Sequence, residues 1–343
     1  MCFFLKKYLP LTNIDKKQQM KLHHTFFYSP STMENNEEII QHFEEKQVSM
    51  QKIQDALGRH TRFVLTEDST ETTLTMGINA AKGVLKESNI SIEEIDAIVF
   101  VSTTPEHRIP NDAIKIHHAL GGKTNTLCYD INVNCIGAFV ALDLACKYLT
   151  GTQSAQNALI ICAEKLSNIL DRENPVTAFC FSDSAFAFIV EKDFSASGLI
   201  DVLYHTDSTF SEAVLFPPKG YSCYHTDDLT LWDTSFDGSG SVDFALNHIE
   251  EFLKRNELSI EQIDLFLFSQ LSIKNINKIR DHFHLPEEKI PFCSKELGYT
   301  GASSPFLALD QYQKNTRQLE KGEYVLIWTL GAGYQAGLML WKY

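Results

Sequence analysis

Residues 131–149 read INVNCIGAFVALDLACKYL, and this stretch decides how the rest of the chain is interpreted. The residues that run into it, TLCYDINV, have the character of a strand. Apolar side chains then recur at spacings of three and four, which predicts a helix with a buried face. We expect Asn134 to be the N-cap of this helix. Cys135 would then lie at a strand-to-helix turn, at the helix N-terminus.

A cysteine at this position has a predictable chemistry. Unpaired N–H groups and the helix dipole stabilise a thiolate, so we expect a lowered pKa for Cys135. Gly137, two residues later, would let another backbone or a substrate approach closely. The local pattern also fits a buried cysteine that merely begins a core helix, and on this pattern alone both interpretations stay open.

An internal repeat organises the chain. Residues 91–96 read SIEEID and run into AIVFVS, whereas residues 259–264 read SIEQID and run into LFLFS. The segment FVALD at residues 139–143 returns in the same order as FLALD at residues 306–310. We therefore predict two homologous halves, residues 21–195 and 196–343, preceded by an N-terminal extension at residues 1–20.

Each half has the same predicted elements. A helical pattern comes first, at residues 71–88 and 242–257, and a continuous apolar run typical of a strand buried on both faces follows. A second helix, a strand, the helix with the repeated segment and a pair of apolar strands complete each half. Helices alternating with buried strands predict an α/β fold. Duplication of the unit predicts five layers, with two sheets enclosing one buried helix from each half.

Composition excludes several classes of function. The 343 residues carry a formal net charge of −14, whereas nonspecific nucleic-acid binding needs clustered Lys and Arg. The same balance disfavours a basic helix on a membrane surface, and no apolar run is long enough to span a bilayer. The first residues lack a signal-peptide pattern, so we expect a cytoplasmic protein. The eight cysteines contain no CxxC and have no spacing typical of a metal site, so no metal is expected.

Several motifs together resemble one known family. VFVSTTPEHRIPNDA (residues 99–113), the stretch around Cys135, AFCFSDSAFAFIVE (residues 178–191) and LGAGYQAGLMLWKY (residues 330–343) occur in the order found in β-ketoacyl-acyl-carrier-protein synthase III enzymes of the thiolase superfamily. The resemblance covers about residues 40–343. It implies a thiolase-like five-layer αβαβα fold and an obligate dimer with active sites near its interface.

The resemblance also implies a chemistry for the site. Cys135 would take an acyl group from a thioester, and the backbone N–H groups of Cys135 and Ala332 would hold the acyl carbonyl. In the family a His and an Asn then assist decarboxylation of a malonyl thioester. Ser269 and Tyr299 occupy those two positions here. A lost oxyanion donor costs roughly 10²–10³ in rate and a lost acid/base roughly 10²–10⁴, so condensation should be suppressed more than acylation.

The donor is expected to be acyl-coenzyme A or an acyl carrier protein, with no bound cofactor. Family members often have a Trp and an Arg near the adenine of coenzyme A, where this chain has Lys52 and Ala56. Arg59 and Arg62 remain as candidates for phosphate contacts. A carrier-protein donor would be less affected by the altered entrance.

Three hypotheses follow from the sequence. The first is an acyltransferase of the 3-oxoacyl-ACP synthase III type in fatty-acid or secondary lipid and polyketide biosynthesis, acting as a homodimer. The second is a catalytically weak subunit that forms a heterodimer with an active paralogue. The third is a scaffold, which retention of Cys135 and its turn disfavours.

Overall fold

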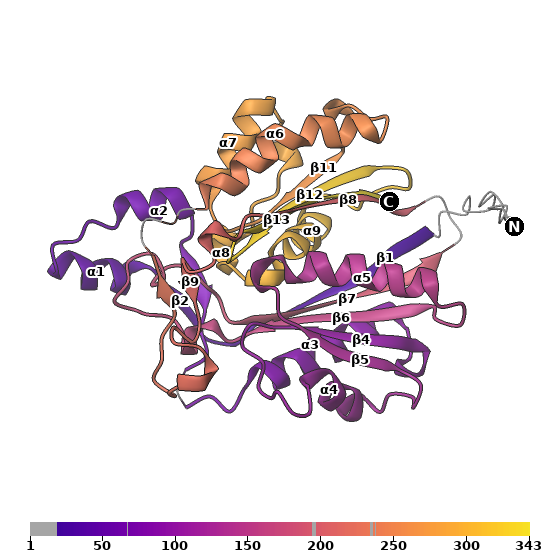
Figure 1. The fold of residues 1–343 in the computed structure, drawn as a ribbon, viewed down its shortest axis with the longest axis horizontal. Coiled ribbons are helices and arrows are strands. Elements are labelled where there is room, and N and C mark those ends of the chain that lie inside the picture. The colour runs from indigo at the N-terminus through magenta and orange to yellow at the C-terminus, as the bar shows by residue number, and fades with distance from the viewer. Residues whose placement is uncertain (1–18, 67, 194–196, 234–235, 237) are drawn as a thin grey trace, which may run out of the picture.

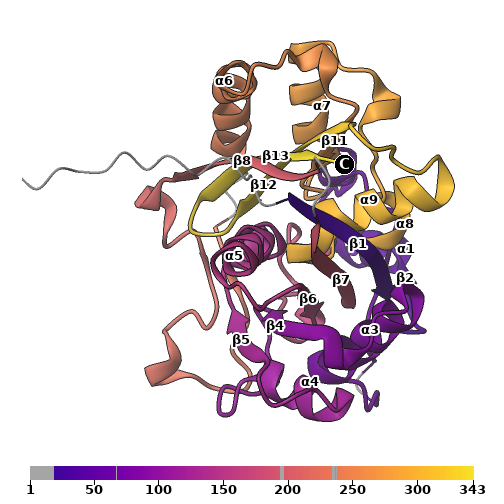
Figure 2. The ribbon, with the colours of Figure 1, turned by 90° about the vertical axis from the view of Figure 1, so that its right-hand side faces the viewer.

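The computed structural model describes residues 19–66, 68–193, 197–233, 236 and 238–343. Two sheets and three layers of helices alternate, as Figures 1 and 2 show. The predicted five-layer αβαβα fold of two duplicated halves is confirmed, because each half supplies one sheet, one outer helical layer and one central helix.

The first sheet has the strand order β1-β7-β6-β4-β5. Its three neighbouring strands β6, β4 and β5 are parallel, whereas β7 and β1 run antiparallel to their neighbours. Helices α3 and α4 cover its outer face (Figure 1). These elements are β1 Gln19–Tyr28, α3 Thr73–Ser88, β4 Ile95–Val101, α4 Asp112–Leu120, β5 Leu127–Ile131, β6 Asn157–Glu164 and β7 Ser184–Asp193.

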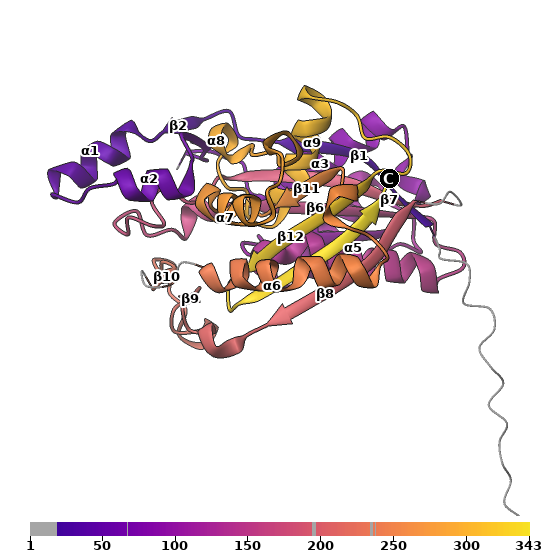
Figure 3. The same cartoon turned by 90° about the horizontal axis from the view of Figure 1, so that it is seen from above.

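The second sheet has the strand order β11-β12-β13-β8, with β11 and β12 parallel. Helices α6 and α7 cover its outer face, as the view from above shows (Figure 3). These elements are β8 Gly198–Thr206, α6 Ser239–Arg255, β11 Leu265–Phe268, α7 Ile273–Phe283, β12 Tyr324–Gly331 and β13 Gln335–Lys342.

The central layer consists of α5 (Gly137–Gly151) and α9 (Ser304–Asn315), which carry the repeated segments FVALD and FLALD. Both helices are buried along most of their length, and their apolar side chains join those of both sheets in one core. Phe188 of β7 stacks on Phe306 of α9 with ring centroids 5.1 Å apart. The central helices therefore fix the distance and register between the two halves.

The repeat is visible at matching positions of the two sheets. Ser91 with Glu94, and Ser259 with Gln262, form capping boxes on short 3₁₀ turns that lead directly into β4 and β11. Strands β1, β7, β6 and β4 of the first sheet correspond in order to β8, β13, β12 and β11 of the second. The two predicted pairs of apolar strands, β6 with β7 and β12 with β13, are antiparallel neighbours.

One predicted strand is wrong. In the described part of the chain no strand lies between α7 and α9, where the first half has β5 between α4 and α5. The corresponding stretch contains Pro291, which has no N–H to donate to a ladder. The Gln270 side chain bonds this stretch instead, donating to the Pro291 carbonyl at 3.2 Å and accepting from the Cys293 N–H at 3.0 Å.

The remaining elements extend from one end of the layers, where α1, α2, β2, β9 and β10 lie (Figures 1 and 3). This is the end at which β4 and β6 finish and the strand-to-helix turn after β5 begins. Short elements with few buried side chains form this end. They are β2 Met33–Asn35, α1 Glu37–Glu45, α2 Gln51–Leu57, β3 Thr61–Phe63, β9 Val214–Leu215, β10 Leu231–Trp232 and α8 Ser294–Leu297.

The predicted chain boundaries fall partly outside the described residues. Residues 1–18 of the predicted N-terminal extension are not described, whereas Gln19 and Met20 begin β1, and Met20 is buried. The predicted boundary at residues 195 and 196 also lies outside the described residues. Strand β7 of the first sheet ends before it, and β8 of the second begins after it. No helix in the described ranges is long and apolar enough to cross a bilayer.

Candidate active site

The carboxyl ends of parallel strands carry the candidate site. In the first sheet β4, β5 and β6 lead to Thr103, Cys135 and Glu164 at one edge. In the second sheet β11 and β12 lead to Ser269 and Ala332. Side chains that follow parallel strands meet at the same edge of a sheet, which is where α/β proteins bind ligands. The duplication brings two such edges together.

A cavity of about 140 Å³ lies where the two edges meet. Cys135, Tyr299 and Ala332 line it, so the structure brings together three of the residues singled out in the sequence. Ser269 lies behind the wall, with 1% of its surface exposed. Most of the wall is apolar and aromatic, formed by Leu166, Ile169, Leu170, Phe181, Val214, Phe216, Trp232, Phe236, Leu271 and Leu330.

The turn that carries Cys135 differs from the predicted N-cap arrangement. Asn134 has a φ of 55°, in the left-handed region that Asn tolerates better than most residues. Asn134–Ile136 form a 3₁₀ turn, η2, and α5 begins only at Gly137 with Ile136 as N-cap. The prediction that Asn134 is the N-cap is therefore wrong. A strained turn, rather than a side-chain cap, connects the strand to the helix.

Gly137 is required by close packing, although its neighbours are side chains rather than the backbone or substrate that we predicted. A Cβ at this position would lie 2.4 Å from Cγ1 of Val101 in β4 and 3.2 Å from the Cβ of Ala302. Such a contact is shorter than real Cβ atoms show, so only glycine lets α5 begin against β4 and against η8 (Gly301–Ser303). The missing side chain thus places Cys135 between the two halves.

The pKa of Cys135 is raised to about 12, so the predicted lowering is wrong. Burial is the main cause, because the largely apolar cavity desolvates a thiolate. The Tyr299 hydroxyl lowers the pKa, whereas the negative charge of Glu164 raises it. The thiol is therefore protonated at neutral pH, and its reaction requires a group that removes the proton.

Tyr299 lies beside the thiol, and Ser269 lies beside Tyr299. Burial raises the pKa of Tyr299 well above its usual range, and interactions with Cys135 raise it further while Ser269 lowers it. Neither the Tyr299 hydroxyl oxygen nor Ser269 Oγ makes a hydrogen bond of ordinary geometry. Tyr299 is held by its backbone, since its carbonyl accepts from the Ser182 N–H at 2.9 Å. The Tyr299 hydroxyl thus keeps its proton and interacts with both Cys135 and Ser269.

The loop after β12 lies against the cysteine turn. Asn134 Nδ2 donates to the Ala332 carbonyl at 3.4 Å. A Cβ on Gly331 would lie 3.1 Å from both Cγ2 of Ile136 and the carbonyl oxygen of Val133. The backbone at Ala332 therefore approaches the backbone at Cys135 closely. The assignment of these two N–H groups as oxyanion donors stays a prediction.

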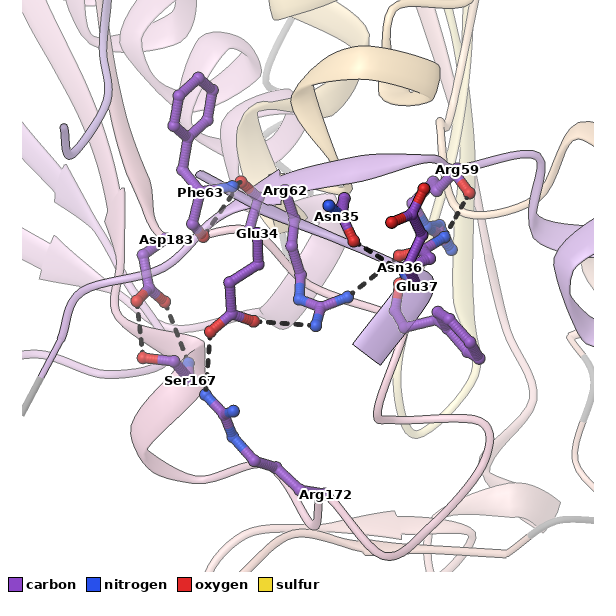
Figure 4. A network of polar contacts seen from close by, with 12 residues as sticks. Glu34, Asn35, Asn36, Glu37, Arg59, Arg62, Phe63, Ser167, Arg172 and Asp183 are labelled. Carbon is purple, nitrogen blue, oxygen red and sulfur yellow. Dashed lines mark hydrogen bonds and ion pairs between the residues drawn. The ribbon is translucent and has the colours of Figure 1, made fainter. Parts of the chain in front are cut away.

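Arg59 and Arg62 lie in the interior. Only 2% of Arg59 is exposed, and its guanidinium donates to the Leu271 carbonyl at 2.9 and 2.5 Å. Arg62 donates to Glu34 at 2.9 Å and to Asn36 at 3.3 Å, as Figure 4 shows. Both guanidinium groups are therefore engaged by the protein itself. Their predicted contact with coenzyme A stays a prediction.

Sequence reasoning missed two features of the site. Glu164, at the end of the apolar run NALIICAE, lines the cavity and was not singled out, although a lone carboxylate ending a buried strand is a recognisable signal. The aromatic wall from residues 214–236 was also missed, because this segment lacks regular periodicity. In the part of the chain that the structure describes, no group of three His, Cys, Asp or Glu side chains could hold a metal ion.

Comparison with known proteins decides the family. Residues 129–208 match the family described as 3-Oxoacyl-[acyl-carrier-protein (ACP)] synthase III, and residues 253–343 match that described as its C terminal. Beta-ketoacyl-[acyl-carrier-protein] synthase III of Wolbachia pipientis subsp. Culex pipiens (strain wPip) is 31% identical over 276 residues, covering 80% of this chain and 86% of that protein. The chain belongs to the 3-oxoacyl-[acyl-carrier-protein] synthase III family. This confirms the resemblance seen in the sequence.

Other synthase III proteins agree over nearly the whole chain. The protein of the same name from Wolbachia pipientis wMel is 28% identical over 316 residues, covering 92% of this chain and 96% of that protein. The crystal structure of 3-oxoacyl-[acyl-carrier-protein] synthase III from Aquifex aeolicus VF5 superposes with a TM-score of 0.83 and 26% identity. It covers 94% of this chain and 100% of that one. The likeness to the Aquifex aeolicus structure therefore extends over nearly the whole chain.

Proposed function

We propose that this protein is an acyltransferase of the 3-oxoacyl-ACP synthase III type that takes an acyl group onto Cys135. The observation that carries the proposal is the position of Cys135, on a strained turn in a largely apolar cavity between the two sheets. Apolar and aromatic walls suit an acyl chain, and the family's substrates are thioesters. We infer a cytoplasmic enzyme without a bound cofactor, in fatty-acid or secondary lipid metabolism.

The first step is an exchange of thioesters. Cys135 Sγ attacks the carbonyl carbon of acyl-coenzyme A or an acyl carrier protein, and the donor's C–S bond breaks as its thiol leaves. The backbone N–H groups of Cys135 and Ala332 would hold the carbonyl oxygen as it becomes negative. Donors directed at that charge contribute a factor of about 10²–10³ each in comparable enzymes.

The second step distinguishes this chain from its relatives. Ser269 and Tyr299 can each donate one hydrogen bond to a bound thioester, and neither accepts a proton near neutral pH. They can orient a thioester carbonyl, but they lack the acid/base role that malonyl decarboxylation requires of a His. We therefore propose that passing the acyl group to an acceptor dominates over condensation with a malonyl thioester.

A carrier protein is the donor that the site favours. The two arginines predicted near coenzyme A phosphates donate instead to Leu271, Glu34 and Asn36. Lys52 and Ala56 stand in α2 where family members often have a Trp and an Arg. The loss of adenine and phosphate contacts weakens the binding of acyl-coenzyme A. It affects an acyl carrier protein less, because that donor also binds through its protein surface.

A catalytically weak subunit is the second candidate. The replaced His and Asn positions and the raised pKa of Cys135 favour it, because all three lower the activity of an isolated chain. In that case the protein would form a heterodimer with an active synthase III paralogue, whereas the first candidate predicts a homodimer. Loading of Cys135 only in the presence of the partner would support this reading.

A two-stage assay tests the proposal. The purified protein is incubated with an acyl carrier protein donor or with acyl-coenzyme A, freed of donor, and then given malonyl carrier protein or thiol, amine and alcohol acceptors. We expect loading of one acyl group, its loss to an acceptor, and slow release of carbon dioxide from malonyl. Failure to load from either donor, alone and with a co-purifying synthase-like chain, would overturn the proposal. Carbon dioxide release as fast as in a relative with His and Asn would contradict the roles of Ser269 and Tyr299.

A further inference from the structure

We propose that Glu164 is the general base that removes the thiol proton of Cys135 during acyl loading. The inference rests on the proposed acyl transfer and names the proton acceptor that this reaction needs. It concerns a carboxylate with 2% of its surface exposed, in the wall of the cavity that Cys135 also lines.

The topology places Glu164 at the reacting edge. It is the last residue of β6, and the parallel neighbour β4 ends just before Thr103. The turn that carries Cys135 follows β5 on the other side of β4. Thr103, Cys135 and Glu164 therefore follow three adjacent parallel strands, and all three line the same cavity.

The two carboxylate oxygens of Glu164 accept different numbers of hydrogen bonds. Oε2 accepts from the Thr103 hydroxyl at 2.6 Å, the Thr104 hydroxyl at 3.2 Å and the Thr103 N–H at 3.1 Å. Oε1 accepts from the same Thr103 N–H, also at 3.1 Å, and from no side chain in the described part of the chain. One oxygen is thus firmly held, whereas the other keeps a free lone pair.

Gly301 leaves space at the free oxygen. A Cβ on Gly301 would lie 3.9 Å from Glu164 Oε1, and no atom lies closer to that Cβ position than 3.6 Å. Gly301 lines the cavity together with Glu164 and Cys135. The free oxygen of the carboxylate is therefore on the side of Gly301, where the second half of the chain meets the first.

The surroundings of the Glu164 carboxylate suit it to act as a base near neutral pH. Among the described residues no Lys, Arg or His forms an ion pair with Glu164. Burial raises its pKa to about 7, and the Thr103 and Thr104 donors limit the rise. A base with a pKa near the operating pH is available and still strong enough to take a proton.

None of the groups around the Glu164 carboxylate competes with it as a proton acceptor near neutral pH. The titratable groups that its charge reaches are Cys135 of η2 and Cys162 of β6 itself. The loop after β4 presents threonines, β7 presents Ser184 opposite Glu164, and η8 presents Gly301, none of which titrates. Ser269 and Tyr299 keep their protons at neutral pH. Among the cavity groups described, Glu164 alone accepts a proton in this range.

Proton transfer also removes the repulsion that raises the pKa of Cys135. While Glu164 is ionised, its negative charge disfavours a thiolate at Cys135. When the proton moves from Sγ to the carboxylate, Glu164 becomes neutral and this repulsion ends. The negative charge therefore rests on Glu164, which has the lower pKa of the two, and it passes to Sγ only as Sγ attacks the acyl carbon.

The step balances without a further reactant. The Sγ–H proton moves to Glu164, directly or through one water, as Sγ forms a bond to the acyl carbon. The tetrahedral intermediate then expels the donor's sulfur, which receives the proton from the Glu164 carboxylic acid. One thioester is broken and one is formed, and Glu164 returns to its ionised form.

The pH dependence of loading tests the inference. Single-turnover loading of Cys135 is measured by intact mass from about pH 5.5 to about pH 9.5 for the wild type, Glu164→Gln and Glu164→Asp. We expect the wild-type rate to rise with pH and level off above about 7, because loading then follows ionised Glu164. Glu164→Gln should load about 10²–10⁴-fold more slowly near neutral pH and rise with pH without levelling, since it depends on free thiolate. Glu164→Asp should recover part of the rate and the plateau.

Thiolate titration separates a base from a merely repulsive neighbour. Removing the negative charge lowers the pKa of Cys135, so Glu164→Gln should contain more thiolate at a given pH while loading more slowly. A purely repulsive Glu164 predicts more thiolate and faster loading, and that result would overturn the inference. Asp183→Asn is the matched control, because Asp183 is also a buried carboxylate held by backbone and Ser167 donors and does not line the cavity. It should keep the wild-type plateau.

The outcomes distinguish this inference from the proposed function. A wild type that loads from no donor contradicts the acyl-transfer proposal itself, and the role of Glu164 then falls with it. A wild type that loads, with an unchanged rate and plateau in Glu164→Gln, contradicts only the role of Glu164. If Glu164→Gln does not fold, the pH dependence of wild-type loading still tests the role of Glu164. A loading rate that rises through about pH 9 without levelling would exclude Glu164 as the general base.

Discussion

The guanidinium carbon of Arg59 lies 5.6 Å from the centre of the Tyr299 ring. Both residues are buried, and Phe181 packs against the same ring at 5.5 Å between centroids. Arg59 also donates to the carbonyl of Leu271, two residues after Ser269. One buried cation thus contacts both segments in which the sequence predicts that the family's His and Asn are replaced.

Replacing Arg59 should disturb both stability and loading. Arg59→Met leaves the Leu271 carbonyl without its donor and removes a desolvated cation–π contact, which together cost about 2–4 kcal/mol. The Tyr299 ring would lose its support, so we expect acyl loading of Cys135 to slow by about tenfold or more. Urea unfolding and single-turnover loading measure the two effects.

An exposed arginine provides the control. Arg317 lies 5.9 Å from the centre of the Tyr312 ring and pairs with Glu323, with 42% of its side chain exposed. Contacts of this kind at the surface contribute about 0–1 kcal/mol, so Arg317→Met should barely change stability or loading. Equal effects of the two substitutions would contradict the role given to Arg59.

The two replaced positions should behave as a coupled pair. Ser269→His inserts an imidazole into a closed interior at a cost of about 1–3 kcal/mol. Tyr299→Asn removes a fully buried ring and leaves a cavity. In the double variant the imidazole can use the vacated space, so we expect it to be more stable than the sum of the single variants by about 0.5–3 kcal/mol.

The double variant should also gain chemistry. It would carry a His and an Asn at the two positions where the resemblance predicts them, so malonyl decarboxylation should rise by about 10²–10⁴ over the wild type. Release of carbon dioxide from malonyl carrier protein measures this directly. Additive destabilisation without any gain in decarboxylation would show that Ser269 and Tyr299 do not occupy the functional His and Asn positions.

A substitution at Gly331 should displace the backbone of the next residue, Ala332. In Gly331→Ala the added Cβ would lie 3.1 Å from atoms of Val133 and Ile136, so the loop must shift away from the cysteine turn. If the Ala332 N–H holds the acyl oxygen, loading should slow by about 10²–10³. Gly151→Ala is the control, because its Cβ meets no atom within 4 Å at the end of α5. Equal loading by both variants would remove Ala332 from the oxyanion site.

The stability of the fold should depend on the ionisation of Glu164. Its pKa in the folded protein, about 7, lies above its ordinary value of 4.5, so the folded state binds this proton more tightly than the unfolded state. The associated stability is present below pH 4.5 and is lost as the pH rises through about 7. The wild type minus Glu164→Gln difference in unfolding free energy should therefore fall by roughly 3 kcal/mol between about pH 4.5 and pH 7.5. A pH-independent difference would contradict the raised pKa.

The fold could be predicted because its signals in the sequence, repeats and apolar periodicity, extend over many residues. The repeated SIEEID and FxALD segments mark a duplication that the two sheets reproduce strand by strand. The pattern after Cys135 predicted α5, and a close neighbour was expected at Gly137, where the side chains of Val101 and Ala302 lie. Such features depend on periodicity and spacing, which a single sequence displays.

The site was less predictable because burial is a property of the assembled chain. The pKa of Cys135 depends on walls from residues 166–236 and on Glu164, which are distant in sequence. Arg59 reads as a surface cation, yet its partners Leu271 and Tyr299 come from the other half. The Gln270 side chain bonds the backbone of Pro291 and Cys293, where we predicted a strand. No periodicity in the sequence indicates such a side-chain contact.

The most direct test of the account is to locate the acyl group on the chain. The protein is loaded from an acyl carrier protein donor, digested, and its cysteine peptides are compared by mass for the wild type, Cys135→Ala and Cys293→Ala. The account predicts one acylated peptide that contains Cys135, absent in Cys135→Ala and retained in Cys293→Ala. An acyl group that persists in Cys135→Ala, or a wild type that carries none with any donor, would contradict it.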